Sequence, residues 1–221
     1  MNRTRAPGDP IPRRLDIHQP ATDFSDRTAL AITRFLRFCA DTLFAKRYGN
    51  RAIVLETVAA VPGMVGGMFV HLRCLRWMRD DGGWVKALLE EADNERMHLM
   101  TFLEIARPSA FERAMVLVAQ ALFFTFFTVL YLVSSRTAHR LVGYFEEEAV
   151  VSYTRYLEAI DAGRIDNVPA PPIAIDYWQL PHDARLREVV IAVRQDEAGH
   201  RDVNHAIASQ NSSEVPATHP L

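Results

Sequence analysis

The feature that most restricts the fold of this chain is a short motif, Glu-x-x-His, which occurs twice. Glu95 and His98 form the first copy, and Glu197 and His200 form the second. Residues three apart lie on one face of a helix, so each pair of side chains can reach a single metal ion. Two short motifs in 221 residues are not decisive, and solvated surface pairs are the alternative.

Further acidic positions favour the metal interpretation. Glu56 is the only charged residue between Ala52 and Val70, and a buried carboxylate is very costly without a cation. A buried arginine partner or a protonated Glu56 is the alternative. The three consecutive glutamates at 146–148 point in three directions on a helix, so at least one is expected to face the core. A solvated acidic patch is the alternative for these three.

The rest of the chain is helical in pattern, with no sustained alternation of apolar and polar residues. Turn residues and prolines divide it into six expected helices, over about 28–46, 51–78, 84–105, from 110 onward, 137–162 and 183–209. A proline-rich connection is expected at 167–181. We expect three parts, namely an extended arm over 1–27, one helical domain over 28–209 and a polar tail over 210–221.

Four of the expected helices carry, in chain order, a Glu, a Glu-x-x-His, a Glu and a Glu-x-x-His. Four carboxylates and two imidazoles from facing helices are the ligand set of a carboxylate-bridged di-iron or di-manganese centre in a four-helix bundle. The expected fold is therefore an all-α, ferritin-like four-helix bundle with two additional helices, the first and the fourth.

The fourth helix indicates a membrane. Residues 114–135 include no charged residue, a length typical of a membrane span. A single crossing would put the ligands of the second and third helices on one side and those of the fifth and sixth on the other, and one metal centre could not form. We therefore expect the first and fourth helices to lie in one leaflet, as in a monotopic protein. A buried core helix is the alternative for the fourth.

The charge distribution agrees with a membrane surface. Residues 1–51 carry a net charge of +5 and the remainder −7, and a basic front end suits anionic lipid. The total of −2 gives no sign of a nucleic-acid partner. Cys39 and Cys74 lie in apolar helical stretches, so we expect them in the core and not in a zinc site or disulfide.

The N-terminal arm is rich in arginine and proline. It has no apolar segment of the kind found in secretory signals, and its acidic residues and four prolines do not suit a mitochondrial transit helix. We expect it to remain in the mature protein.

At this point the sequence resembles a known family, the alternative oxidases, which are membrane-bound di-iron quinol oxidases. The resemblance runs from about Phe35 to Ala206. Four blocks carry it: Arg51–Gly67 (RAIVLETVAAVPGMVGG), Asn94–Leu99 (NERMHL), Phe145–Ala149 (FEEEA) and Asp196–His205 (DEAGHRDVNH).

The resemblance implies two iron ions per chain, and it selects the first glutamate of the triplet as a ligand. The implied ligands are Glu56, Glu95, His98, Glu146, Glu197 and His200. It also implies that Tyr153 is a redox-active tyrosine beside the metals, seven residues after Glu146 and so on the same helical face. The residues around the ligands would be Asn94, His139, Asp196 and Trp178. Without the family, Tyr153 and Trp178 would be interpreted as core aromatics.

For the quinol pocket, the resemblance implies Arg51, Leu55, Glu148, Ala149 and Ser152. The chain departs from the family pattern at three positions. Phe145 stands where the family usually has Leu, Ser152 where it usually has Thr, and Gly199 where a His is frequent. The first two departures put the pocket wall and inhibitor affinity in doubt. His71 resembles a histidine at the family's dimer interface and supports a homodimer.

The resemblance implies a cyanide-insensitive terminal oxidase that oxidises ubiquinol and reduces dioxygen to water without pumping protons. A membrane-bound di-iron hydroxylase of quinone biosynthesis and a ferritin-like iron-binding protein are the alternatives. The expected partners are ubiquinol, dioxygen, one membrane leaflet and a second copy of the chain, with no nucleic acid. The short arm favours the cytoplasmic face of a bacterial inner membrane; the matrix face of the mitochondrial inner membrane is the alternative.

Overall fold

The structure is a computed structural model and describes residues 14–44 and 48–210, with the backbone alone at 43, 44, 48–51, 54, 111, 112 and 115. In these residues it has helices and no strand, which confirms the all-α prediction. The helices are α1 (Phe24–Phe44), α2 (Tyr48–Trp77), α3 (Trp84–Ala106), α4 (Ala110–Val133), α5 (Ser135–Asp161), α6 (Pro172–Trp178) and α7 (Leu186–Ser209).

The largest differences from the sequence prediction are at the start of α1 and in the proline-rich connection. Helix α1 begins four residues earlier than expected, because Asp23 Oδ1 accepts a hydrogen bond from the backbone N–H of Asp26 at 3.0 Å and so caps the first turn. The proline-rich connection includes the short helix α6, which was not predicted. Pro172 is its first residue, where the missing N–H of proline has no cost.

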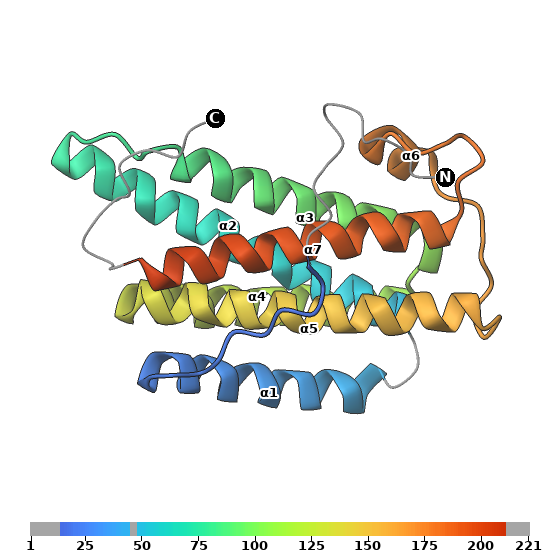
Figure 1. Ribbon diagram of the computed structural model, residues 1–221, viewed down its shortest axis with the longest axis horizontal. Coiled ribbons are helices and arrows are strands. Elements are labelled where there is room, and N and C mark those ends of the chain that lie inside the picture. The colour runs from blue at the N-terminus through green and yellow to red at the C-terminus, as the bar shows by residue number, and fades with distance from the viewer. Residues whose placement is uncertain (1–13, 45–47, 211–221) are drawn as a thin grey trace.

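Helices α2, α3, α5 and α7 form the bundle (Figure 1). Helix α2 packs along α3, and α5 packs along α7. A Cβ atom on Gly63 of α2 would lie 2.4 Å from the carbonyl oxygen of Leu88, so only glycine permits this close approach of α2 to α3. Helix α4 connects α3 to α5 and packs on α2 and α5, as predicted for a crossover helix. Helix α1 lies along α5 on the side away from α7, at the lower edge of Figure 1.

Within residues 14–44 and 48–210, two helices are long and apolar enough to cross a membrane, at Leu55–Trp77 of α2 and Val116–Val133 of α4. The α2 segment is 39% buried and belongs to the bundle, whereas the α4 segment is only 11% buried. The buried-core alternative for the fourth helix is therefore wrong. Helix α1 also exposes large apolar side chains, at Phe35 and Phe38.

The described part of the N-terminal arm packs against helices α5 and α7 of the same chain. The backbone N–H of Gln19 donates to Glu147 of α5 at 2.8 Å, and Arg201 of α7 donates to the carbonyl oxygen of Arg14 at 2.7 Å. The predictions for residues 1–13 and for the tail after residue 210 lie outside the described residues.

Candidate metal centre

The six ligands implied by the family resemblance come together in the middle of the bundle. Donor atoms of Glu56, Glu95, His98 and Glu197 lie within 4.8 Å of one another, and so do donor atoms of Glu95, Glu146, Glu197 and His200. Glu95 and Glu197 belong to both groups. Two ions placed side by side and sharing two carboxylates would use the donor set in this way.

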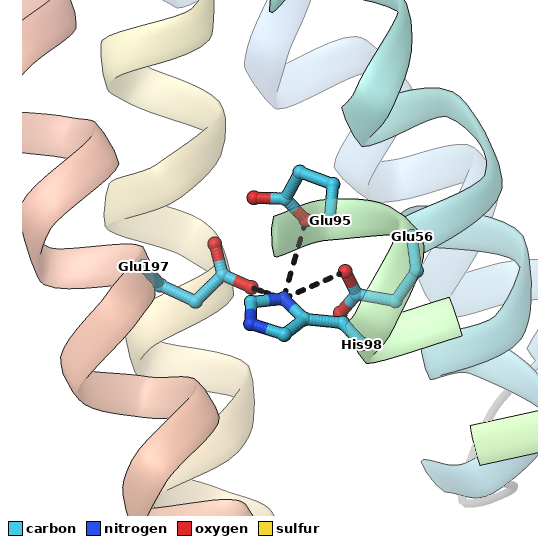
Figure 2. A group of neighbouring side chains, drawn as sticks. All are labelled: Glu56, Glu95, His98 and Glu197. Atoms are coloured by element: carbon cyan, nitrogen blue, oxygen red, sulfur yellow. Dashed lines mark hydrogen bonds and ion pairs between the residues drawn. The ribbon is translucent and has the colours of Figure 1, made fainter. Parts of the chain in front are cut away.

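Each of the four helices carries its ligands on the face that points into the bundle. The Glu-x-x-His pairs of α3 and α7 face inward, with Glu95, His98 and Glu197 almost fully buried. Figure 2 shows Nδ1 of His98 facing three carboxylates, those of Glu56, Glu95 and Glu197, each at 3.3 Å. The surface-pair alternative for the two motifs is therefore wrong.

Glu56 is buried, as predicted, and its partners in the described residues are a histidine and a tyrosine. It contacts His98 and accepts a hydrogen bond from the hydroxyl of Tyr153. No arginine is among its partners in the described part of the chain, so the arginine alternative is wrong there.

The glutamates at 146–148 point in three directions, as expected. Glu146 is buried in the centre. Glu147 contacts His18 at 2.5 Å and His205 at 2.9 Å, and Glu148 pairs with Arg37 of α1 at 2.7 Å. Because each has a distinct environment, the solvated-patch alternative is wrong.

The centre has an excess of acidic groups in a dry environment. Burial raises the pKa of Glu56 and of Glu146 well above the usual range, and a neighbouring carboxylate adds to the effect. Burial acts the same way on Glu95, but the two imidazoles outweigh it and hold the pKa of Glu95 well below its usual range. Burial lowers the pKa of an imidazole, yet the carboxylates raise the pKa of both histidines well above normal. Bound protons thus partly neutralise the group, and metal cations would replace them.

Several buried atoms of the centre have no hydrogen-bond partner. They are both carboxylate oxygens of Glu95, Oε2 of Glu197 and Nδ1 of His200. His200 Nδ1 lies 2.6 Å from Glu95 Oε1, but the two atoms do not have the angles of a hydrogen bond. Buried polar atoms nearly always have partners, so unpartnered lone pairs that face one another fit hard cations with oxygen and nitrogen ligands.

Tyr153 is buried beside the centre, on the same face of α5 as Glu146. Its hydroxyl donates to Glu56, and its ring stacks on Phe102 with centroids 5.7 Å apart. From the sequence alone, Tyr153 would be interpreted as a core aromatic. Its hydroxyl contact with Glu56 distinguishes it from an ordinary core tyrosine.

Three of the residues predicted around the ligands form one network at His98. Asp196 Oδ2 lies 3.3 Å from Nε2 of His98 and accepts hydrogen bonds from Trp178 Nε1 at 2.8 Å and Asn94 Nδ2 at 3.1 Å. The indole of Trp178 also stacks on the His98 ring, with centroids 5.7 Å apart. Helix α6, absent from the prediction, is the element that brings Trp178 to this position.

The fourth predicted residue, His139, lies in a second network whose other members were not predicted. His139 Nδ1 donates to Oδ1 of Asn204 at 2.9 Å. The Asn204 amide donates to both oxygens of Glu91, at 2.9 and 3.1 Å. Glu91 follows Glu90 in an ordinary acidic stretch, and its only sequence signal is its place one turn before Glu95.

Of the residues expected in the quinol pocket, Leu55, Ala149 and Ser152 are half-buried, and Glu148 is paired with Arg37. The side chain of Arg51 lies outside the described residues. Phe145 is half-buried, with its ring 5.9 Å from that of Phe123 on α4. Among the other positions singled out from the sequence, His71 is exposed and Cys39 is half-buried. Cys74 and Gly199 are buried.

Comparison with known proteins agrees with this geometry. The chain matches the family model described as Alternative oxidase over residues 13–209. It is 59% identical over 191 residues to "Ubiquinol oxidase 1a, mitochondrial" of Arabidopsis thaliana, covering 86% of this chain and 54% of that protein. It is 57% identical over 188 residues to "Alternative oxidase 3, mitochondrial" of Glycine max, covering 85% and 58%. It is 57% identical over 194 residues to "Ubiquinol oxidase, mitochondrial" of Batrachochytrium dendrobatidis, covering 88% and 61%.

The chain therefore spans little more than half the length of these relatives. The matched region includes every helix of the bundle and all six residues of the centre. Alternative oxidases are di-iron carboxylate enzymes, and the buried Glu and His side chains suit such a centre. The predicted resemblance is confirmed, and the chain belongs to the alternative oxidase family.

Proposed function

We propose that this protein is a ubiquinol oxidase, which oxidises two ubiquinol molecules and reduces one dioxygen to two waters. Each ubiquinol releases two electrons and two protons, so two molecules balance the reaction without proton pumping. The buried group of four carboxylates and two imidazoles is the observation that carries the proposal, and two of the relatives above are named ubiquinol oxidase. The family match favours neither the hydroxylase nor the ferritin-like alternative.

Glu95 and Glu197 belong to both donor groups, so they would contribute to holding both irons. Glu56 and His98 would complete one iron site, and Glu146 and His200 the other. When bound, the di-iron pair supplies the stepwise transfer of electrons to dioxygen. The chain's own part is to hold these ligands in fixed positions and to exclude water from them.

Tyr153 is the candidate local donor of an electron and a proton. Burial, with the neighbouring Glu56, raises the pKa of Tyr153 well above its usual range, so the resting phenol keeps its proton. That proton points at Glu56, which is itself a proposed ligand. A tyrosine with this contact is placed to give up its proton to a carboxylate as it loses an electron.

Ubiquinol is lipid-soluble, so we infer that it enters from a membrane leaflet. The exposed apolar side chains of α4 and α1 support a monotopic attachment through these two helices. The proposed pocket residues Leu55, Glu148, Ala149 and Ser152 lie on α2 and α5, close in sequence to ligands. Arg37 links α1 to Glu148, which supports a pocket that opens near α1.

We further propose a homodimer in a mitochondrial membrane. Helix α2 exposes an apolar stripe, Met64, Met68, Leu72 and Leu75, which is suited to a second copy. The relatives above carry mitochondrial names, which supports the matrix face of the mitochondrial inner membrane. None of them supports the bacterial location favoured by the sequence.

Oxygen uptake tests the function. Membranes that contain the protein are given a short-chain ubiquinol in the presence of cyanide, with Glu95→Ala as the inactive variant. Uptake in the parent, with ubiquinone as the product and none in the variant, is expected. An oxygenated quinone product, or iron-loaded protein without uptake, would refute the oxidase.

A further inference from the structure

Helices α3 and α7 run antiparallel, so their inward-facing side chains meet in successive layers. His98 Nδ1 lies 3.3 Å from Glu197 Oε1, and one turn back along α3, Glu95 Oε1 lies 2.6 Å from His200 Nδ1. Both of these layers consist of proposed ligands. Carboxylates that are crowded in a dry site disfavour one another until cations bind. The two layers therefore need support from side chains outside the ligand set.

The next layer along the same two helices contains no proposed ligand. Glu91 lies one turn before Glu95 on α3, and Asn204 lies one turn after His200 on α7. The Asn204 amide donates to both Glu91 oxygens, at 2.9 and 3.1 Å. Both side chains are almost fully buried, so water does not compete for these hydrogen bonds. This layer joins α3 to α7 without a metal.

Asn204 extends this layer to a third ligand helix. Its Oδ1 accepts a hydrogen bond from His139 Nδ1 of α5 at 2.9 Å, and its amide also donates to the carbonyl oxygen of His200 at 3.0 Å. One side chain thus connects α3, α5 and α7 through hydrogen bonds that involve no ligand side chain. Helix α2 packs along α3, and α5 packs along α7, so the contact of Asn204 with Glu91 joins one helix pair to the other.

We propose that Asn204 is a positioning residue for the metal centre, which holds the α2–α3 pair in register with the α5–α7 pair before iron binds. The proposal rests on the ligand assignment in the proposed function. The hydrogen bonds, and not the charge of Glu91, have this effect, because an amide oxygen would accept in the same way. A contact that contributes only stability is the competing explanation. It would lower the free energy of unfolding and leave the affinity of the folded protein for iron unchanged.

The test uses the folded full chain and measures three quantities: its affinity for Fe²⁺ against a competing chelator without oxygen, the Mössbauer spectrum of the ⁵⁷Fe-loaded protein, and denaturant unfolding. Asn204→Leu removes all hydrogen bonds of that side chain at similar size. Glu91→Leu removes only the acceptor on α3, and Glu91→Gln keeps one acceptor oxygen. Ser209→Ala is the matched control on α7, because the Ser209 hydroxyl accepts from Arg140 at 3.0 Å and so connects only α5 and α7.

Asn204→Leu and Glu91→Leu are each expected to lower the affinity for iron by about 10- to 100-fold and to alter the Mössbauer spectrum. Glu91→Gln should keep most of the parent affinity, and Ser209→Ala all of it. If Asn204→Leu does not fold, Glu91→Leu decides. The proposal is overturned if the leucine variants unfold more easily but keep the iron affinity and spectrum of the parent, or if Glu91→Gln loses as much affinity as Glu91→Leu. A parent protein that binds no iron pair would instead refute the proposed function.

Discussion

Two groups of charged side chains include adjacent residues of α5, Glu146 and Glu147, and they differ in the source of their cation. The metal centre starts at Glu146. The second group, here called the Arg140 cluster, consists of Asp26, Arg140, His205, Glu147 and His18. Arg140 Nε lies 2.8 Å from Asp26, and both residues are almost fully buried. Among the described residues, a permanent cation therefore pairs with the Arg140 cluster, and none pairs with the four carboxylates of the centre.

This difference explains why the metal centre is suited to bind cations, whereas the Arg140 cluster only holds helices together. An arginine guanidinium stays charged when buried and satisfies a carboxylate permanently. The Arg140 cluster uses that property to attach α1 and the arm to α5 and α7. A Cβ atom on Gly143 would lie 2.4 Å from Nδ1 of His205, so glycine is required for the ring to pack there. The centre has only titratable imidazoles, which can exchange their protons for metal.

Separate substitutions of Glu146 and Glu147 test the difference between the two groups most directly. Glu146→Gln removes an anionic ligand, so iron binding and oxygen uptake should both be lost, a fall of more than about 100-fold. Glu147→Gln should keep two irons per chain and most of the activity. Iron analysis and cyanide-resistant uptake measure both. Equal iron loss in the two variants would show that the two groups are not separate.

The Arg140 cluster should respond in stability and not in iron. Arg140→Met removes the cation that lies 2.8 Å from the buried Asp26 and leaves Arg136 at 4.0 Å. Loss of one partner of a buried charge pair typically costs about 3–5 kcal/mol of unfolding free energy. The double variant Asp26→Asn with Arg140→Met should recover part of the loss, because no buried charge is left. Denaturant unfolding of the iron-loaded protein gives these energies. Single and double variants of equal stability would contradict the paired-charge explanation.

Tyr153→Phe tests the centre without disturbing its ligands. The ring and its stacking on Phe102 remain, so two irons should stay bound. Loss of the hydroxyl that donates to Glu56 should lower turnover on the order of 100-fold. Iron content together with the rate of uptake separates the two effects. An unchanged rate would remove this tyrosine from the proposed mechanism.

The two groups also differ in how much of each could be predicted from the sequence. Glu-x-x-His spacing and the isolated charge of Glu56 predicted most of the centre, because helical geometry places residues three apart on one face. The choice of Glu146 among three consecutive glutamates came only from the family resemblance, because periodicity fixes relative directions and not which one faces inward. The start of α1 and the short α6 were missed, since each depends on local capping within polar or proline-rich sequence.

Contacts between residues that are far apart in the chain and belong to no motif could not be predicted from the sequence. Asp26 and Arg140 have no shared motif, and Glu91 differs from Glu90 only in facing inward. Asn204 lies inside the block DEAGHRDVNH, but nothing in its spacing indicates a bond to Glu91. Such pairs are set by how the helices pack against one another, which a single sequence does not encode in any short pattern.

The smallest expected effect concerns the acid side of the stability curve. Burial would raise the pKa of Glu147, but hydrogen bonds from His205, Gln19 and His18 outweigh it and lower the pKa below 4.5. A carboxyl with a lowered folded-state pKa adds stability above its unfolded value, and this stability is lost as the pH falls through the folded value. Glu147→Gln should therefore flatten the loss of stability below about pH 4.5. Urea midpoints of parent and variant from pH 7 to 4 measure this, and parallel curves would show that Glu147 has no titration linked to folding.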